Sequence, residues 1–221
     1  LSLADVDAAI VSHGHYDHGG GLRSFLACNS RATVYLHPDA FLPHYSLRDT
    51  GVASIGLDSS LATHPRLVFC SGIAPLSARL TLFSDVRGDC WYPPGNQRLF
   101  VSEDGQLDTF SHEQNLLISE GEMDVLVAGC AHRGLVNILS RCTELSGHAP
   151  NYVIAGMHLM NSGMCFPDEQ DFFRKFATQL MKYSNTTYYT MHCTGAEPYA
   201  QLKSILGDQI HYLSCGEKVV L

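Results

Sequence analysis

The chain has few charged residues and no long hydrophobic run. Charged residues make up 16% of the 221 positions, and 14 Lys and Arg against 22 Asp and Glu give a formal net charge of −8. Proteins that bind the nucleic-acid backbone carry a basic patch, so this balance argues against such a partner. No apolar stretch approaches the ~18 residues of a membrane span, and no signal-peptide pattern opens the chain. We therefore expect a cytoplasmic protein without a nucleic-acid or membrane partner.

Several motifs that would indicate other protein classes are also lacking. The eight cysteines are irregularly spaced and never form Cys-x-x-Cys, which argues against a small disulfide scaffold. There is no phosphate-binding glycine loop and no Ser-His-Asp signature. A length of 221 residues with 45% hydrophobic content is typical of one domain with its own core. We predict a single domain over residues 1–221.

Strand-like and helix-like patterns alternate along the chain. Short apolar or β-branched runs predict strands at residues 7–11, 32–36, 80–83, 98–101, 115–119, 124–127, 152–155, 186–191, 210–213 and 218–221. Apolar residues at helical spacing predict helices at 22–26, 135–145, 168–183 and 198–206, the last closed by Gly207. Residues 43–66 show neither pattern and are expected to be irregular. The alternation favours an α/β sandwich with helices outside the sheets.

The first strand runs directly into a segment rich in metal-ligand side chains. The segment reads Ser-His-Gly-His-Tyr-Asp-His-Gly-Gly from Ser12, so His13, His15, Asp17 and His18 lie within six residues. Imidazole and carboxylate are the usual ligands of zinc, iron and manganese. His13 and His15 are two residues apart and can point toward one metal, whereas Asp17 and His18 can face a second. A histidine-rich surface loop is the alternative, but the preceding strand and the neighbouring glycines disfavour it.

Three further histidines each follow a predicted strand. His132 follows the strand at 124–127, His158 follows the strand at 152–155, and His192 follows the strand at 186–191. One such histidine alone would more often be structural. Strand ends at one edge of a sheet converge in space, so the three together with the first motif predict a metal site.

These motifs resemble those of the metallo-β-lactamase superfamily. Within it, the chain is most similar to the branch of dihydropterin-ribofuranosylaminobenzene phosphate synthase-like metal-dependent hydrolases. The resemblance rests on segments that begin at Ser12, Gly129, Gly156 and His192 and extends over nearly the whole chain. It implies an αββα metallo-β-lactamase sandwich.

The resemblance also implies a ligand set. His13, His15 and His132 would hold a first metal, and Asp17, His18 and His192 a second. Most of the superfamily has an aspartate that bridges the two metals where this chain has His158. A neutral imidazole cannot bridge two metals as a carboxylate does, so His158 would ligate one metal, support a ligand or contact the substrate.

The beginning of the chain departs from the superfamily pattern. Members usually have several strands before the first metal motif, whereas this chain enters the motif after one. We therefore expect the fold to lack its N-terminal strands here. An uncovered strand edge tends to pair, which predicts either a homo-oligomer or pairing with a missing N-terminal segment.

Three other residues are candidates for substrate contact. His112 and Glu113 precede the strand predicted at 115–119 and could line the substrate pocket or simply begin that strand. Arg133 follows His132 and could bind a substrate anion or lie at the surface. The remaining isolated histidines are treated as background: His44, His64, His148 and His211.

The implied metals determine the expected chemistry. The cofactors would be two divalent ions, with zinc preferred to iron or manganese, that lower the pKa of bound water toward ~7 and polarise the substrate. We expect a hydrolase that uses metal-activated hydroxide, at a mono- or dinuclear site, on a small and phosphorylated or pterin-like metabolite. Asp17 and His158 are the predicted catalytic residues. The alternatives are a non-catalytic metal-binding protein of the same fold and a di-iron redox protein, although the latter has glutamate where His15 stands.

Overall fold

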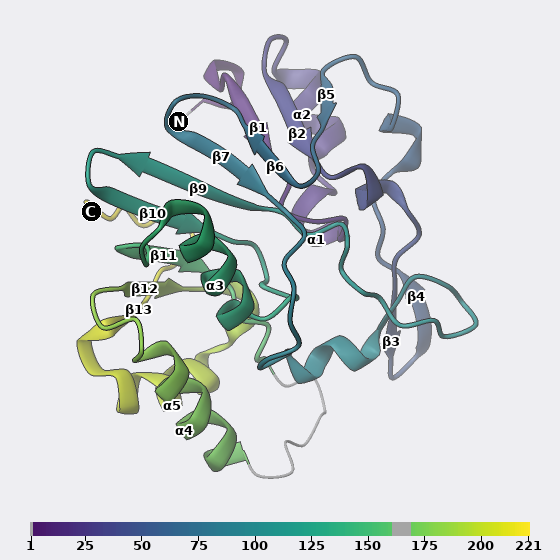
Figure 1. Ribbon diagram of the computed structural model, residues 1–221. Coiled ribbons are helices and arrows are strands. Elements are labelled where there is room, and N and C mark those ends of the chain that lie inside the picture. Colours follow the sequence, from purple (N-terminus) through teal and green to yellow (C-terminus); the bar gives the residue numbers. More distant parts are fainter. Residues whose placement is uncertain (1, 161–168) are drawn as a thin grey trace. The chain divides into compact units, whose positions relative to one another are not determined.

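The computed structural model describes residues 2–160 and 169–221 (Figure 1). The chain forms two compact units, which are described separately below. Unit 1 consists of Leu1–Ala74, Leu82–Asp85 and Gln97–Gln114, and unit 2 of Pro75–Thr81, Val86–Asn96 and Asn115–Leu221. The single-domain organisation stays a prediction. Within the described ranges, no helix combines the length and the apolar character needed to cross a membrane.

A small parallel sheet forms the centre of unit 1. Its order is β1-β2-β5, built from β1 (Ala8–Ile10), β2 (Thr33–Leu36) and β5 (Leu67–Phe69). Alternate residues of β2 are fully buried, so one face of this sheet meets a core, as the pattern of its β-branched residues predicts. That core contains Val11, Leu22, Val34, Leu36, Ala40, Leu61 and Leu67.

Two short helices follow the first strand of unit 1. They are α1 (Tyr16–Gly19) and α2 (Leu22–Cys28), and η1 (Leu3–Asp5) precedes β1. The histidine-rich segment therefore lies in the turn between β1 and α1 and continues into α1. Because β1 is pinned by its pairing with β2, it fixes where this turn begins.

The segment predicted to be irregular contains a β-hairpin instead. β3 (Tyr45–Arg48) pairs antiparallel with β4 (Gly51–Ser54), and β3 also pairs with β8 (Leu99–Phe100), so the sheet order is β4-β3-β8. The short 3-10 helices η2 (Pro38–Phe41) and η3 (Ser59–Leu61) flank the hairpin in sequence. The partner strand β8 lies about fifty residues further along the chain, so local sequence patterns could not reveal this sheet.

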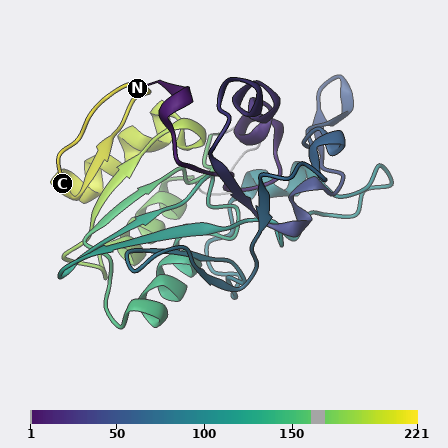
Figure 2. The same ribbon diagram turned by 90° about the horizontal axis from the view of Figure 1, so that it is seen from above.

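A larger mixed sheet organises unit 2. Its strand order is β13-β12-β11-β10-β9-β7-β6. The chain leaves unit 1 within β6 and returns to it within β7. The strands are β6 (Ile73–Pro75), β7 (Leu80–Phe83), β9 (Asn115–Glu120), β10 (Met123–Val127), β11 (Tyr152–Ala155), β12 (Thr187–Thr190) and β13 (Ile210–Tyr212). β10 to β13 are parallel to one another, whereas β9 is antiparallel to β10. Figure 2 shows the successive strands rotated relative to one another, as sheet twist requires.

Three helices pack beside the strands of unit 2 (Figure 1). They are α3 (Leu135–Ser146), α4 (Glu169–Leu180) and α5 (Ala196–Leu206), and the shorter η4 (Pro94–Arg98), η5 (His192–Thr194) and η6 (Gly207–Gln209) lie in the connections. Ile138, Leu139 and Phe173 are almost completely buried, which is why these helices carry apolar residues at helical spacing. Gly147 ends α3 in a left-handed conformation with φ of 84°.

The predicted α/β class is confirmed, as are most of the predicted elements. The described part of the helix predicted at 168–183 runs from Glu169 to Leu180, and Asp168 lies outside the described residues. The strand predicted at 218–221 is wrong: these residues are exposed and have no regular structure, and no strand of the described residues pairs with them. The described cysteines form no disulfides, in keeping with the argument against a small disulfide scaffold.

Candidate functional site

The turn after β1 buries two of the predicted ligands of unit 1. His13 is completely buried and His15 is 4% exposed. Ser12 Oγ lies 2.9 Å from Nδ1 of His13, and the rings of His13 and His18 have centroids 4.1 Å apart. This contact orients the ring of His13 from its Nδ1 side, as the partners of metal-binding histidines do.

Asp17 and His18 occupy the first turn of α1, on the more exposed side of this group. Asp17 Oδ2 lies 3.5 Å from Nε2 of His18, and the side chain of Asp17 is 56% exposed against 19% for His18. The four residues of the motif therefore lie together in unit 1, as predicted, with two imidazoles buried and the carboxylate open to solvent.

Gly14, between the two buried histidines, is held tightly by its surroundings. Its backbone N–H donates to Nδ1 of His112 at 2.8 Å. A Cβ atom at this position would lie 2.6 Å from Nε2 of His44 and would also collide with the carbonyl oxygen of Ala40. Only glycine fits here, because the ring of His44 fills the space that a side chain would need.

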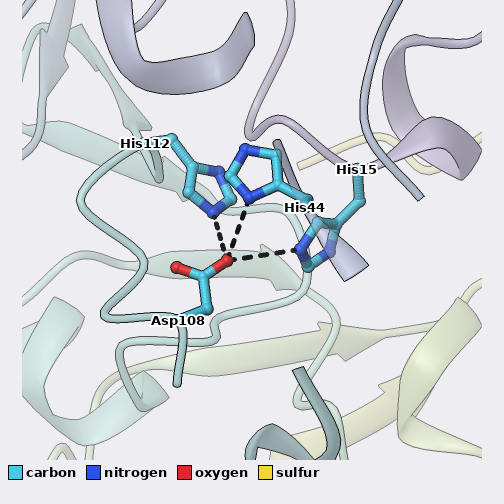
Figure 3. Close-up of side chains that lie close together, drawn as sticks. All are labelled: His15, His44, Asp108 and His112. Atoms are coloured by element: carbon cyan, nitrogen blue, oxygen red, sulfur yellow. Dashed lines mark hydrogen bonds and ion pairs between the residues drawn. The ribbon is translucent and has the colours of Figure 1, made fainter. Parts of the chain in front are cut away.

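A buried carboxylate joins three histidines in unit 1. Asp108 Oδ2 lies 3.1 Å from Nδ1 of His44, 3.1 Å from Nε2 of His112 and 3.9 Å from Nε2 of His15. Figure 3 shows the three rings directed at the same carboxylate oxygen. The four side chains, all buried, also form a group of ligand atoms that lie within 4.8 Å of one another.

The charges of this group follow from its hydrogen bonds. Burial opposes ionisation of Asp108, but the hydrogen bonds from His112 and His44, together with the nearby ring of His15, outweigh it and hold the pKa of this carboxyl well below its usual range. Burial lowers the pKa of His112 to about 4, against the opposing effect of Asp108, and burial also lowers the pKa of His15. At neutral pH the group thus contains an ionised Asp108 beside neutral rings of His15 and His112.

In unit 2, the three strand-end histidines lie at the same edge of the sheet. β10, β11 and β12 are adjacent and parallel, so the residues that follow their carboxyl ends are brought together, as predicted. The rings of His132 and His158 have centroids 4.3 Å apart. Cys130 joins both of them in one group of ligand atoms within 4.8 Å, and joins His192 and Cys193 in another.

Asn96 fixes the orientation of His132. Its amide nitrogen donates to the carbonyl oxygen of His132 at 2.7 Å, and its Oδ1 lies 2.9 Å from Nδ1 of His132. Because Oδ1 only accepts, Nδ1 of His132 carries the proton and Nε2 presents its lone pair. This buried asparagine was not among the predicted site residues; it comes from the Pro-Pro-Gly turn, 36 residues before its partner.

His158 and His192 both have unusual backbones. Their φ angles are 47° and 50°, a region that is costly for residues other than glycine and that is often found at functional sites. The N–H of His158 donates to Sγ of Cys193 at 3.3 Å. A hydrogen bond with Cys130 lowers the pKa of the Cys193 thiol, burial opposes this effect, and the contacts with His158 add to it. His192 itself is exposed.

The three residues predicted to contact substrate, His112, Glu113 and Arg133, are buried or hydrogen-bonded within the protein. The guanidinium of Arg133 donates to the carbonyl oxygen of Val86 at 2.7 and 3.0 Å and to the hydroxyl of Tyr92 at 2.7 Å, so it fastens the loop 86–92. Glu113 is 2% exposed and His112 is 1% exposed. His44, treated as background in the sequence, is a full member of the Asp108 group; that interpretation was wrong.

The residues present suit a divalent metal. Among the residues that the structure describes, Nδ1 of His158 and Nε2 of His44 are buried without a hydrogen-bond partner. A buried imidazole nitrogen without a partner is costly unless something binds it, and a metal ion would do so at His158. In unit 2, the group of Cys130, His132 and His158 gathers donors of the types that zinc accepts.

Comparison with known proteins points to one superfamily. Residues 1–76 match the family model of the metallo-beta-lactamase superfamily. A crystal structure of a metal-dependent hydrolase of the beta-lactamase superfamily is 28% identical, with a TM-score of 0.77 over 96% of this chain and 78% of that one. The resemblance predicted from the motifs is confirmed, and so is the metallo-beta-lactamase fold.

Two archaeal proteins are similar over most of the chain. The 7,8-dihydropterin-6-methyl-4-(beta-D-ribofuranosyl)-aminobenzene-5'-phosphate synthase of Methanocaldococcus jannaschii is 25% identical over 88% of this chain and 68% of its own length. An uncharacterized protein of the same organism is 23% identical over 90% of this chain and 73% of its own length.

The packing around Gly14 predicts a large effect of one methyl group. Gly14→Ala forces the added Cβ against His44 and Ala40, so we expect the free energy of unfolding to fall by about 1–3 kcal/mol, as in overpacked cores. Urea denaturation measures this change. Gly21→Ala is the matched control, because nothing lies within 4 Å of a Cβ there. Equal stability of the two variants would contradict the tight packing.

The lowered pKa of His112 predicts a loss of stability in acid. In the unfolded state His112 takes up a proton near the ordinary histidine pKa of 6.5, whereas in the folded state it stays neutral until about pH 4. The free energy of unfolding of the metal-free protein should therefore decrease as the pH falls from 6.5 to 4. His112→Gln should show a shallower decrease in urea titrations at several pH values. Parallel pH dependences of the two proteins would count against a neutral, buried His112.

Proposed function

We propose that this chain, which has the fold of the metallo-beta-lactamase superfamily and resembles its members in sequence, is a metal-dependent hydrolase. The observation that carries the proposal is the set of oriented imidazoles in each unit. His13 and His132 each have a polar partner at Nδ1, which fixes the orientation of the ring. Histidines held in this way are typical of metal centres.

The histidines of both units are the proposed ligands. His13, His15, Asp17 and His18 come from the turn after β1, and His132, His158 and His192 from the ends of parallel strands. Which of them share an ion stays the prediction drawn from the resemblance, with His13, His15 and His132 on one metal and Asp17, His18 and His192 on the other. When bound, a divalent metal supplies Lewis acidity and a water of lowered pKa.

The chain's own residues would orient the reaction. The carboxylate of Asp17 is exposed and stays within 3.5 Å of His18, so it is placed to accept a proton from an attacking water. The Nδ1 atom of His158 is buried without a hydrogen-bond partner among the described residues, which suits a role on metal or substrate. Asn96 keeps His132 in one tautomer and thus keeps its Nε2 available.

The substrate class is proposed from the relatives. One similar protein is named for a product that carries both a dihydropterin and a ribofuranosyl phosphate, and the similar crystal structure is of a hydrolase. We infer a small metabolite, phosphorylated or pterin-like, with zinc as the preferred metal and two ions as the preferred number. A metal-binding protein without catalysis is the second candidate, since Arg133, the predicted anion contact, is occupied with the loop 86–92.

Metal analysis combined with a hydrolysis assay tests the proposal. The purified protein should bind at least one zinc ion and should cleave a nitrophenyl phosphodiester or ester in a manner that a chelator abolishes and added metal restores. Mutating a residue that only supports a metal ligand weakens metal binding by about 10–100-fold. His13→Ala and His132→Ala remove proposed ligands themselves, so they should weaken zinc binding by more than this. His148→Ala, an exposed histidine, is the control and should bind as the wild type does.

The outcomes separate the two candidates. Zinc binding without turnover on any substrate would favour the non-catalytic candidate. A protein that binds no metal, or binds it equally well in all the variants, would contradict both.

A further inference from the structure

We propose that Asp108, acting through His112 and His44, is a positioning residue that holds the His13-Gly14-His15 turn in the shape required for binding metal. The inference rests on the proposed metal-binding function and assigns a role to residues outside the ligand set. All of these residues lie in unit 1.

The carboxylate of Asp108 is fixed from both of its oxygens. Oδ1 accepts the backbone N–H of Phe110 at 2.6 Å, and Oδ2 receives the imidazoles of His44 and His112 at 3.1 Å each. The carboxylate, His44 and His112 are all at least 93% buried. A charge in such a place persists only because donors surround it, so it holds the rings that supply those donors.

The hydrogen bonds also determine the protonation of each ring. An ionised carboxylate only accepts, so His44 must carry its proton on Nδ1 and His112 on Nε2. The Gly14 N–H, which donates to Nδ1 of His112, requires the same tautomer independently. With its proton on Nε2, His112 has no lone pair facing the group and cannot ligate a metal there.

The group of His15, His44, Asp108 and His112, called the hub below, is therefore held together around a carboxylate and is not a further metal site. The three rings point at the oxygen of Asp108 itself, as Figure 3 shows, and not at a common empty point. This geometry distinguishes the hub from the other histidine groups, although its four side chains are of the types that bind metals.

The hub reaches the turn by three routes. His112 binds the Gly14 N–H, the ring of His44 fills the space above the Gly14 Cα atom, and Asp108 faces Nε2 of His15 at 3.9 Å. The positions of Gly14 and His15 in the turn therefore depend on Asp108, which lies more than 90 residues further along the chain.

Cobalt binding by matched variants tests the inference. Asp108→Asn replaces one acceptor oxygen by an NH2 group, which must then face either the histidine donors or the N–H of Phe110, and His112→Ala removes the bond to Gly14. For both we expect Co²⁺ affinity to fall by about 10–100-fold and its visible absorption spectrum to change. His112→Gln keeps one acceptor and one donor and should restore affinity and spectrum. Asp124→Asn removes another buried aspartate paired with a histidine, in unit 2, and should behave as the wild type does.

Each outcome decides the matter. Wild-type affinity and spectrum in folded Asp108→Asn and His112→Ala would overturn the inference while the proposed function stands, provided that the wild type binds Co²⁺. Failure of the wild type to bind Co²⁺ would overturn both. If thermal melting shows that Asp108→Asn does not fold, the pair of His112 variants decides: rescue by glutamine supports the hub, and equal loss in both variants overturns it.

Discussion

A single buried carboxylate organises the histidine-rich end of unit 1. Asp108 accepts hydrogen bonds from His44 and His112, and these two rings in turn contact the turn after β1. Burying a charge is unfavourable unless hydrogen bonds compensate it, so this arrangement is stable only when every donor is in place. The same requirement explains why position 14 must be glycine: a side chain there would displace His44 and open the group.

Unit 2 presents its histidines by a different physical means. Parallel pairing of β10, β11 and β12 brings the three strand ends to one edge, and short turns carry His132, His158 and His192. Positive φ angles at His158 and His192 store strain that the surrounding sheet must offset. Asn96 then selects the tautomer of His132, as Gly14 and Asp108 select that of His112.

Sequence patterns predicted the parts of this structure that depend on local periodicity. The strands before His13, His132, His158 and His192 are short apolar or β-branched runs, and their ends are marked by glycine or histidine, so the sequence predicted which histidines lie at strand ends. It could not predict Asp108 or His44, because the two residues are 64 positions apart and lie in segments without periodicity. The hairpin of β3 and β4 was missed for a similar reason, since β8, its further partner, is distant along the chain. The strand expected at 218–221 shows the converse: β-branched residues form no strand without a neighbour.

The protonation states of the histidines test the central claim most directly. Long-range ¹⁵N–¹H NMR correlation spectra of the metal-free protein near neutral pH report which ring nitrogen of each histidine carries the proton. We predict that His112 is neutral with its proton on Nε2 and that His44 carries a proton on Nδ1, both donating to an ionised Asp108. A proton on Nδ1 of His112, or a doubly protonated His112, would contradict this, because the Gly14 N–H would then have no acceptor.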